Sequence, residues 1–166
     1  MRHPALLALA ALPFLIACAQ QQSGGVEPPT SPADAPPAEV AFTTVLQQSN
    51  PGQTGETVRE AVRDEAAWTA LWAKLREGTA LPEEPPVVDF RTDMVIAAAM
   101  ETQGCVAKVT IRKIVQESGG LAVDLLEAPP APNCVCITSE RPIHIVRLPR
   151  AEGPVRFDVE RGQTSC

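Results

Sequence analysis

The chain has 166 residues, with 14 Lys and Arg against 20 Asp and Glu, a net charge of -6 and a pI near 4.9. This length fits one modest domain with appendages, and an acidic chain with four Phe, two Trp and no Tyr lacks the cationic and aromatic surfaces that bind nucleic acid. Two histidines, His3 and His144, are too few for a His-rich metal cluster.

The N-terminus predicts export and a lipid anchor. Arg2 precedes an apolar run over residues 5–16, and these 12 residues are too few for a bilayer core that needs about 20. Residues 15–18 read Leu-Ile-Ala-Cys, which resembles the lipobox of bacterial lipoproteins. The resemblance implies that residues 1–17 are a signal peptide and that Cys18 carries palmitate or related acyl chains, which anchor the mature protein in the bilayer.

Two or three acyl chains give stable anchoring, because each buried methylene contributes about 0.8 kcal/mol. Ala19, rather than Asp, follows the lipidated cysteine, and the sorting rule of such lipoproteins then implies the outer membrane if the cell has two membranes. Ordinary secretion is the alternative, because Ala17-Cys18-Ala19 also has the small-x-small form of a soluble-protein cleavage site.

Residues 18–39 are rich in Gln, Gly and Pro and show no hydrophobic period. Such a segment cannot bury enough apolar area to offset its chain entropy, so we expect a disordered tether after the lipidated cysteine. It would reach about 25 Å as a coil and about 60 Å in a polyproline conformation. A ligand for a proline-binding module is the alternative interpretation.

Residues 40–166 are expected to form one β-rich domain. Short strands are predicted at residues 40–46 and 57–62. The run Met94–Met100 is apolar without alternation, which is typical of a central strand that is covered on both faces.

Alternating apolar residues predict three later strands. The alternation begins at Val109 and Ile111 and then slips by one residue, which predicts a bulge near Lys113. Gly119 and Gly120 predict a hairpin turn, because both tolerate a positive φ. The remaining alternating residues are Leu121, Val123, Leu125, Val155, Phe157 and Val159.

One helix is predicted between Asp64, a good N-cap, and Gly78, which ends it. An apolar stripe at helical spacing runs along it, formed by Trp68, Leu71, Trp72 and Leu75. Such a stripe is usually core, and docking of a partner is the alternative. We therefore expect a mainly β (α+β) fold, a compact antiparallel β sandwich or barrel-like domain with one packed amphipathic helix.

With Cys18 lipidated, four cysteines remain in an oxidising compartment, an even number that permits two disulfides. Four cysteines allow three connectivities. If Cys134 and Cys136 lie on a regular strand, they share a face and each bonds elsewhere, so we favour a bridge from Cys105 into this pair and another from Cys166 to its remaining member. The alternatives are a soft-metal site of three thiolates and His144, and a redox role, which the CxC spacing disfavours.

The other ionisable residues do not predict an active site. His144 lies between two isoleucines in a strand pattern, so we expect it to face solvent or a hydrogen-bonded core position. A glycosidase needs two carboxylates facing each other across a cleft of about 5 to 10 Å. Nothing in the pattern places the acidic loop residues in this way, namely Glu83, Glu84, Asp89, Asp93 and Glu101. We expect no enzyme activity and no cofactor.

Short motifs follow a fixed order through residues 42–160: Trp-x-x-Leu-Trp from residue 68, Val-Asp-Phe from 88, Met-Val-Ile-Ala from 94, Thr-Gln-Gly-Cys from 102 and Pro-Ile-His-Ile-Val from 142. This order resembles the C-terminal domain of the protease complex subunit PrcB family, exported bacterial proteins named after an accessory subunit of a surface protease complex. The family's turn is typically Thr-Gly-Gly-Tyr, from which Gln103 and Cys105 depart. The resemblance implies a noncatalytic β-rich domain that binds or stabilises another exported protein.

We therefore expect a membrane-anchored lipoprotein of the cell envelope that binds an envelope protein, such as an exported protease of which it is an accessory subunit. The contact is expected in loops, because loops commonly carry recognition. The candidate loops are the turn with Thr102, Gln103 and Gly104 and the Pro-rich loop with Glu83 and Glu84. The alternatives are a protease inhibitor-like binding domain and a thiol metal-binding envelope protein.

Overall fold

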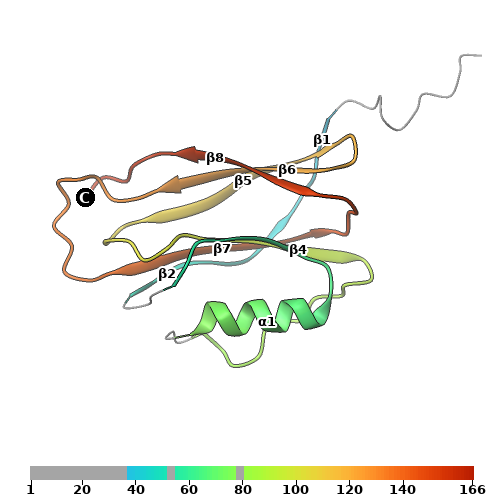
Figure 1. Cartoon of the computed structure of the whole chain (residues 1–166), viewed down its shortest axis with the longest axis horizontal. Coiled ribbons are helices and arrows are strands. Elements are labelled where there is room, and N and C mark those ends of the chain that lie inside the picture. Colours follow the sequence, from blue (N-terminus) through green and yellow to red (C-terminus); the bar gives the residue numbers. More distant parts are fainter. Residues whose placement is uncertain (1–36, 52–54, 78–80) are drawn as a thin grey trace, which may run out of the picture.

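The computed structural model describes residues 37–51, 55–77 and 81–166, which fold into two facing four-stranded sheets with one helix on the outer face of the second (Figure 1). The elements in chain order are β1 (Ala38–Glu39), β2 (Thr43–Pro51), β3 (Val58–Val62), α1 (Glu65–Arg76), β4 (Asp93–Ala99), β5 (Lys108–Glu117), β6 (Gly120–Ala128), β7 (Glu140–Pro149) and β8 (Val155–Arg161). The expected class, a mainly β sandwich with one packed helix, is confirmed.

The first sheet has the strand order β1-β5-β6-β8 and the second β2-β7-β4-β3. Every neighbouring pair is antiparallel except β6 and β8, which run parallel because the chain crosses to the other sheet as β7 between them. The disordered tether was expected to run to residue 39, but its last two residues, Ala38 and Glu39, form β1. Together β1 and β2 connect the sheets, since β1 pairs with β5 and β2 pairs with β7.

β4 confirms the prediction of a central strand, because it pairs with β7 on one side and β3 on the other and is buried almost throughout. Val95, Ala97 and Ala99 pack towards the helix, whereas alternate residues pack between the two sheets. These alternate residues are Met94, Ile96 and Ala98. A strand that serves two cores needs apolar side chains on both faces, which explains the absence of alternation.

The β5–β6 hairpin contains the predicted bulge, a register shift between Ile111 and Lys113. Its turn lies one residue earlier than predicted, because Gly120 already pairs with Glu117 and the two connecting residues are Ser118 and Gly119. Gly119 has φ +96°, which explains its glycine. Gly120 is required for a different reason, because a Cβ at this position would clash with the Pro154 carbonyl oxygen.

The helix α1 begins as predicted, with Asp64 Oδ1 accepting a hydrogen bond of 2.8 Å from the Ala67 N–H. All four residues of the predicted stripe are buried against the second sheet: Trp68, Leu71, Trp72 and Leu75. The stripe is therefore core in this structure. Gly78, predicted to end the helix, lies outside the described residues.

The two indole N–H groups fasten the Pro-rich loop to the helix. Trp68 Nε1 donates to the Pro86 carbonyl at 2.9 Å, and Trp72 Nε1 donates to the Pro82 carbonyl at 3.0 Å. The two rings lie 5.4 Å apart between centroids. Each tryptophan thus buries its apolar body and also satisfies its only polar group.

His144 occupies a hydrogen-bonded core position, one of the two sites expected for it. Only 3% of the residue is exposed. Its Nδ1 accepts a 2.8 Å hydrogen bond from the Ile111 N–H, so the neutral ring carries its proton on Nε2, which lies 3.2 Å from Thr44 Oγ1. The imidazole therefore connects β7 to β5 and β2, at a part of β5 that lies beyond its pairing with β1.

We expect the free energy of unfolding to fall as the pH drops through about 6.5. Burial lowers the pKa of His144, so the unfolded chain binds its proton first and protonation favours unfolding. Below this pH, the slope of the free energy of unfolding against pH should approach the value for one proton, about 1.4 kcal/mol per pH unit. Urea unfolding at a series of pH values from 8 to 5.5 should give a nearly constant free energy above about pH 7 and a growing slope below pH 6.5, which H144Q should lack. An equal slope in H144Q would assign the titration elsewhere.

Candidate functional site

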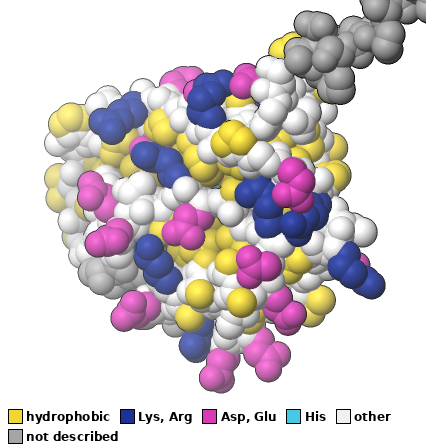
Figure 2. Space-filling view, turned by 45° about the vertical axis from the view of Figure 1, so that its right-hand side comes forward, with side chains coloured by type: hydrophobic (Ala, Val, Ile, Leu, Met, Phe, Trp, Pro, Cys, Tyr) yellow, Lys and Arg dark blue, Asp and Glu magenta, His cyan; other side chains and the backbone are white. Residues whose placement is uncertain are grey.

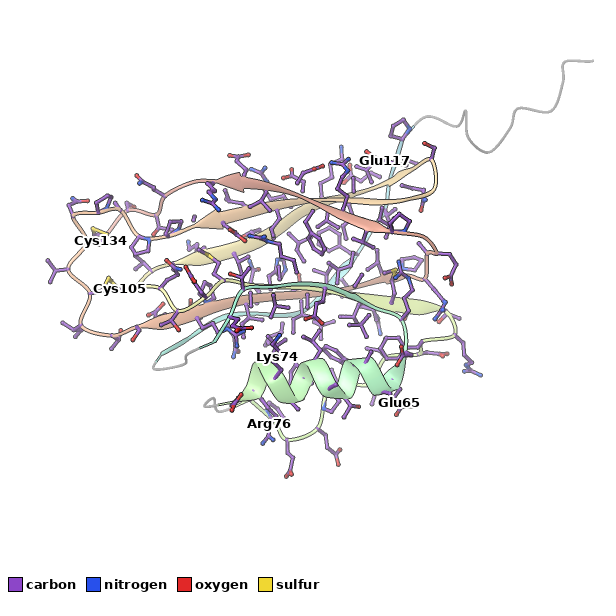
Figure 3. All side chains as sticks on the ribbon, in the orientation of Figure 1. Glu65, Lys74, Arg76, Cys105, Glu117 and Cys134 are labelled. Carbon is purple, nitrogen blue, oxygen red and sulfur yellow. A yellow bond between two sulfur atoms is a disulfide. The ribbon has the colours of Figure 1, made fainter. Side chains whose placement is uncertain are left out.

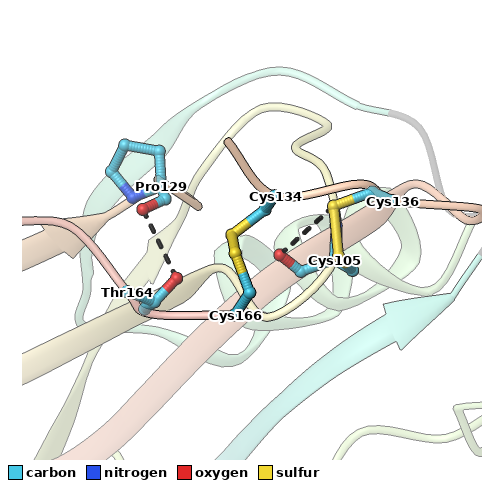
Figure 4. The surroundings of a disulfide bond; sticks show 6 residues. All are labelled: Cys105, Pro129, Cys134, Cys136, Thr164 and Cys166. Carbon is cyan, nitrogen blue, oxygen red and sulfur yellow. Dashed lines mark hydrogen bonds between the residues drawn. A yellow bond between two sulfur atoms is a disulfide. The ribbon is translucent and has the colours of Figure 1, made fainter. Parts of the chain in front are cut away.

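Two disulfides gather three segments at one end of the sandwich (Figure 4). Cys105 is bonded to Cys136, and Cys134 is bonded to Cys166. The expected pattern is confirmed, and the structure adds which member of the close pair each bridge takes. The β4–β5 connection, the β6–β7 connection and the C-terminal tail are thereby tied together.

Hydrogen bonds hold the C-terminal tail in the same place (Figure 4). Thr164 donates to the Pro129 carbonyl through its N–H at 2.9 Å and through its hydroxyl at 3.4 Å. The Ala131 N–H donates to the Thr164 carbonyl at 3.0 Å. The tail is therefore fixed by backbone contacts as well as by its terminal disulfide.

The segment that contains Cys134 and Cys136 presents apolar side chains to solvent. Its side chains alternate: Cys134 and Cys136 turn inwards to their bridges, whereas Val135 and Ile137 are 90% and 96% exposed. Neither Val135 nor Ile137 makes a hydrogen bond to any other described residue. We call residues 134–137 the clamped segment. Val135 lies between the two bridged cysteines and Ile137 directly follows Cys136; a turn at residues 132 and 133 precedes the segment, and it ends in a bend at residues 137 and 138.

Val106 adds a third apolar residue at this end, 40% exposed and directly after a bridged cysteine. Its φ of 58° is unusual for a β-branched residue, and such strain is often found at functional sites. Beside it, a groove of about 870 Å³ lies between β2 and β5. Most of the lining side chains are uncharged, among them Gln47, Ser49, Thr110, Gln163 and Thr164.

The predicted turn at residues 102–104 lies at this same end. Gln103 exchanges two backbone hydrogen bonds with Glu140, at 2.7 and 2.9 Å, which tie the turn to the start of β7. A Cβ on Gly104 would lie 2.9 Å from the Cys136 sulfur, so glycine lets the backbone approach the bridge closely. The turn therefore packs against the Cys105–Cys136 bridge.

A smaller polar pocket of about 230 Å³ lies on the other side of this turn. Arg59 donates two hydrogen bonds to one oxygen of Glu127, at 3.0 and 2.5 Å, and so joins β3 to β6 across the two sheets. Glu101, Gln103 and Arg161 also line the pocket. Glu127 is the most buried acidic residue of this pocket, and its carboxylate is paired with Arg59.

The second predicted contact loop, with Glu83 and Glu84, belongs to a different surface. It follows α1, passes along the helix side of the molecule and is fastened through the two indole contacts (Figure 1). Cys105 and Cys134 lie at the far end of the sandwich (Figure 3). The structure therefore separates this loop from the 102–104 turn and from the clamped segment.

Asp89, which precedes β4, and Asp93, its first residue, are paired with arginines. Asp89 accepts two side-chain hydrogen bonds from Arg91, both at 2.9 Å, and these lower the pKa of Asp89 to about 2. Asp93 lies 3.5 Å from Arg147. A carboxyl that loses its proton so readily cannot act as the general acid that glycoside hydrolysis needs.

The opposite end of the sandwich carries charges in pairs. Glu117 marks this end in Figure 3, and it accepts hydrogen bonds from Arg156 at 3.0 and 3.2 Å. Arg150 likewise pairs with Glu152 at 2.8 Å. Figure 2 shows positive and negative side chains interspersed over the face that it draws, with apolar side chains between them. This face therefore lacks a large field of one sign.

The soft-metal alternative needs free thiolates, whereas Cys105, Cys134, Cys136 and Cys166 are all paired in disulfides. In the described ranges, no three residues with His, Cys, Asp or Glu side chains are grouped to hold a metal ion. Both nitrogens of His144 already have hydrogen-bonding neighbours.

Cys18 and most of the expected tether lie outside the described residues. Within the part that is described, no helix is both long and apolar enough to cross a membrane. No protein-family model, curated protein or solved structure matches this chain.

Sequence reasoning did not single out Val135 and Ile137, although a signal was present. If Cys134 and Cys136 point towards their bridges, the two residues that alternate with them must point away. The same segment, residues 131–139, contains no charged side chain. An uncharged segment around two bridged cysteines, with apolar residues alternating with them, therefore indicates an exposed apolar loop.

Proposed function

We propose that this protein is a lipid-anchored lipoprotein of the cell envelope whose β domain is a noncatalytic protein-interaction module. The observation that carries the proposal is the clamped segment, where Val135, between the two bridged cysteines, and Ile137, next to one of them, are almost fully exposed. Apolar side chains fixed in solvent are typical of a contact surface, because their burial in a partner is favourable and little conformational entropy is lost.

The position of the chain ends supports this arrangement. The described chain enters through β1, where Ala38 pairs with Gln116, next to the Glu117 end of the sandwich. The clamped segment lies at the other end (Figure 3). A tether running from an acylated Cys18 would therefore hold the clamped segment away from the lipid and towards other envelope proteins.

The resemblance to the PrcB family supports an accessory role, in which the domain binds or stabilises an exported protease. The turn that departs from the family's pattern is the one that abuts the Cys105–Cys136 bridge. We therefore assign the contact to the clamped segment rather than to the turn itself.

We expect the tagged, membrane-extracted protein to recover an exported protein in mild detergent, and the V135D/I137D variant to lose it. Each aspartate would place a charge where the partner buries a methyl group, which is strongly unfavourable. V87D is the matched control, because Val87 is 95% exposed but lies in the loop after α1. Equal recovery by V135D/I137D and the wild type would reject the clamped segment as the contact.

A further inference from the structure

The clamped segment has the form of a peptide held ready for a binding cleft. We propose that the clamped segment, residues 134–137, binds in the substrate cleft of an endopeptidase whose pocket accepts small apolar side chains, and that the domain inhibits this enzyme. The inference rests on the proposed function in that both place the contact at this end. It adds the class of partner and the consequence of binding.

The backbone of the segment matches what such a cleft recognises. Cys134 donates its N–H to the Ala131 carbonyl, whereas Val135 and Ile137 keep their N–H and carbonyl groups free of other described residues. A chain with free backbone groups can be bound by main-chain hydrogen bonds, with its projecting side chains in pockets. Val135 and Ile137 are the side chains in phase to enter such pockets.

The shape and charge of the segment select the kind of partner. Val135 and Ile137 project from the surface, so a concave partner can enclose them, whereas a flat partner would bury them only in part. Residues 131–139 carry no charge, so a pocket with a buried carboxylate, as in trypsin, has no cation to receive. A small apolar pocket, as in elastase, fits valine or isoleucine.

The two bridges explain why the segment would inhibit rather than be consumed. Cleavage after Val135 would break its bond to the Cys136 nitrogen, place the Val135 acyl group on the enzyme's serine oxygen and leave a free amine on Cys136. Cys134 stays bonded to Cys166 and Cys136 to Cys105, so neither new end can leave. The held amine can attack the acyl group, expel the serine oxygen and restore the peptide bond.

The test uses the full mature protein in detergent, with elastase and trypsin as probes and a small chromogenic substrate for each. The wild type should slow elastase at near-stoichiometric concentration and leave trypsin unaffected. V135D should need at least about a 100-fold higher concentration for the same effect, because a carboxylate enters the pocket poorly. V87D should behave as the wild type.

V135R supplies a gain-of-function test that does not depend on loss of fold, since the side chain is exposed. Arginine at this position should slow trypsin and no longer slow elastase. The inference is overturned if the wild type does not slow elastase in large excess, or if elastase simply degrades the segment. If it fails while recovery of an envelope protein still depends on Val135 and Ile137, the proposed function stands without it.

Discussion

Replacing Trp68 with alanine is expected to lower the free energy of unfolding by about 3 to 5 kcal/mol. The side chain is 2% exposed and lies between α1 and the second sheet, against Trp72. Its removal leaves a cavity in a closed part of the core. It also leaves the Pro86 carbonyl without its indole donor and so loosens the loop that follows the helix.

Urea unfolding followed by circular dichroism would measure this loss. T69A is the matched control, since Thr69 is exposed on the same helix and only donates its hydroxyl to the Glu65 carbonyl. T69A should change the free energy of unfolding by no more than about 0.5 kcal/mol. A loss below about 1 kcal/mol in W68A would mean that the helix contributes little to the core.

Removing the Cys134–Cys166 bridge is expected to cost about 3 to 4 kcal/mol. The sequence separation of 32 residues sets the size of the loop that the bridge closes in the unfolded chain. The Cys105–Cys136 bridge has a separation of 31 residues, so C105A/C136A should lose a similar amount. The similarity of the two losses is itself a prediction, because each loop has nearly the same closure entropy.

The two double variants, C134A/C166A and C105A/C136A, would be compared with the wild type by urea unfolding in oxidising buffer. The wild type in reductant is the control, and it should lose stability in the same sense. A loss below about 1 kcal/mol for either pair would show that the unfolded chain is not restrained by that bridge. Both variants should also free the clamped segment and weaken recovery of a partner.

Much of the fold was predictable because local pattern and tertiary role agree. The stripe from Trp68 to Leu75 predicted both the helix and its buried face, and the continuous apolar run from residue 94 predicted a strand with two covered faces. The phase slip near Lys113 predicted a bulge that the register contains. In each case the side-chain period is fixed by the backbone geometry.

Other features depend on contacts that a local pattern cannot contain. Gly119 and Gly120 look equivalent in sequence, yet one supplies a positive φ and the other makes room for the Pro154 carbonyl. The parallel pairing of β6 with β8 follows from the crossover through β7. Ala38 and Glu39 resemble tether in composition, and they form a strand because the β5 edge receives them.

The candidate site was predictable in part. The bridges from Cys105 and Cys166 into the Cys134/Cys136 pair followed from an even number of cysteines and the CxC spacing, whereas the choice within the pair required the fold. The 102–104 turn lies at the clamped end, and the loop with Glu83 and Glu84 lies elsewhere. Spacing along the chain does not show which loops meet at the end of a sandwich.

Intact-mass analysis of the protein isolated from its own cells, with and without reductant before alkylation, tests the central claim most directly. We predict that residues 1–17 are absent, that the N-terminal Cys18 carries two or three acyl chains, and that the other four cysteines are alkylated only after reduction. A cytosolic protein with residues 1–17 attached and all its cysteines alkylated without reductant would contradict the account.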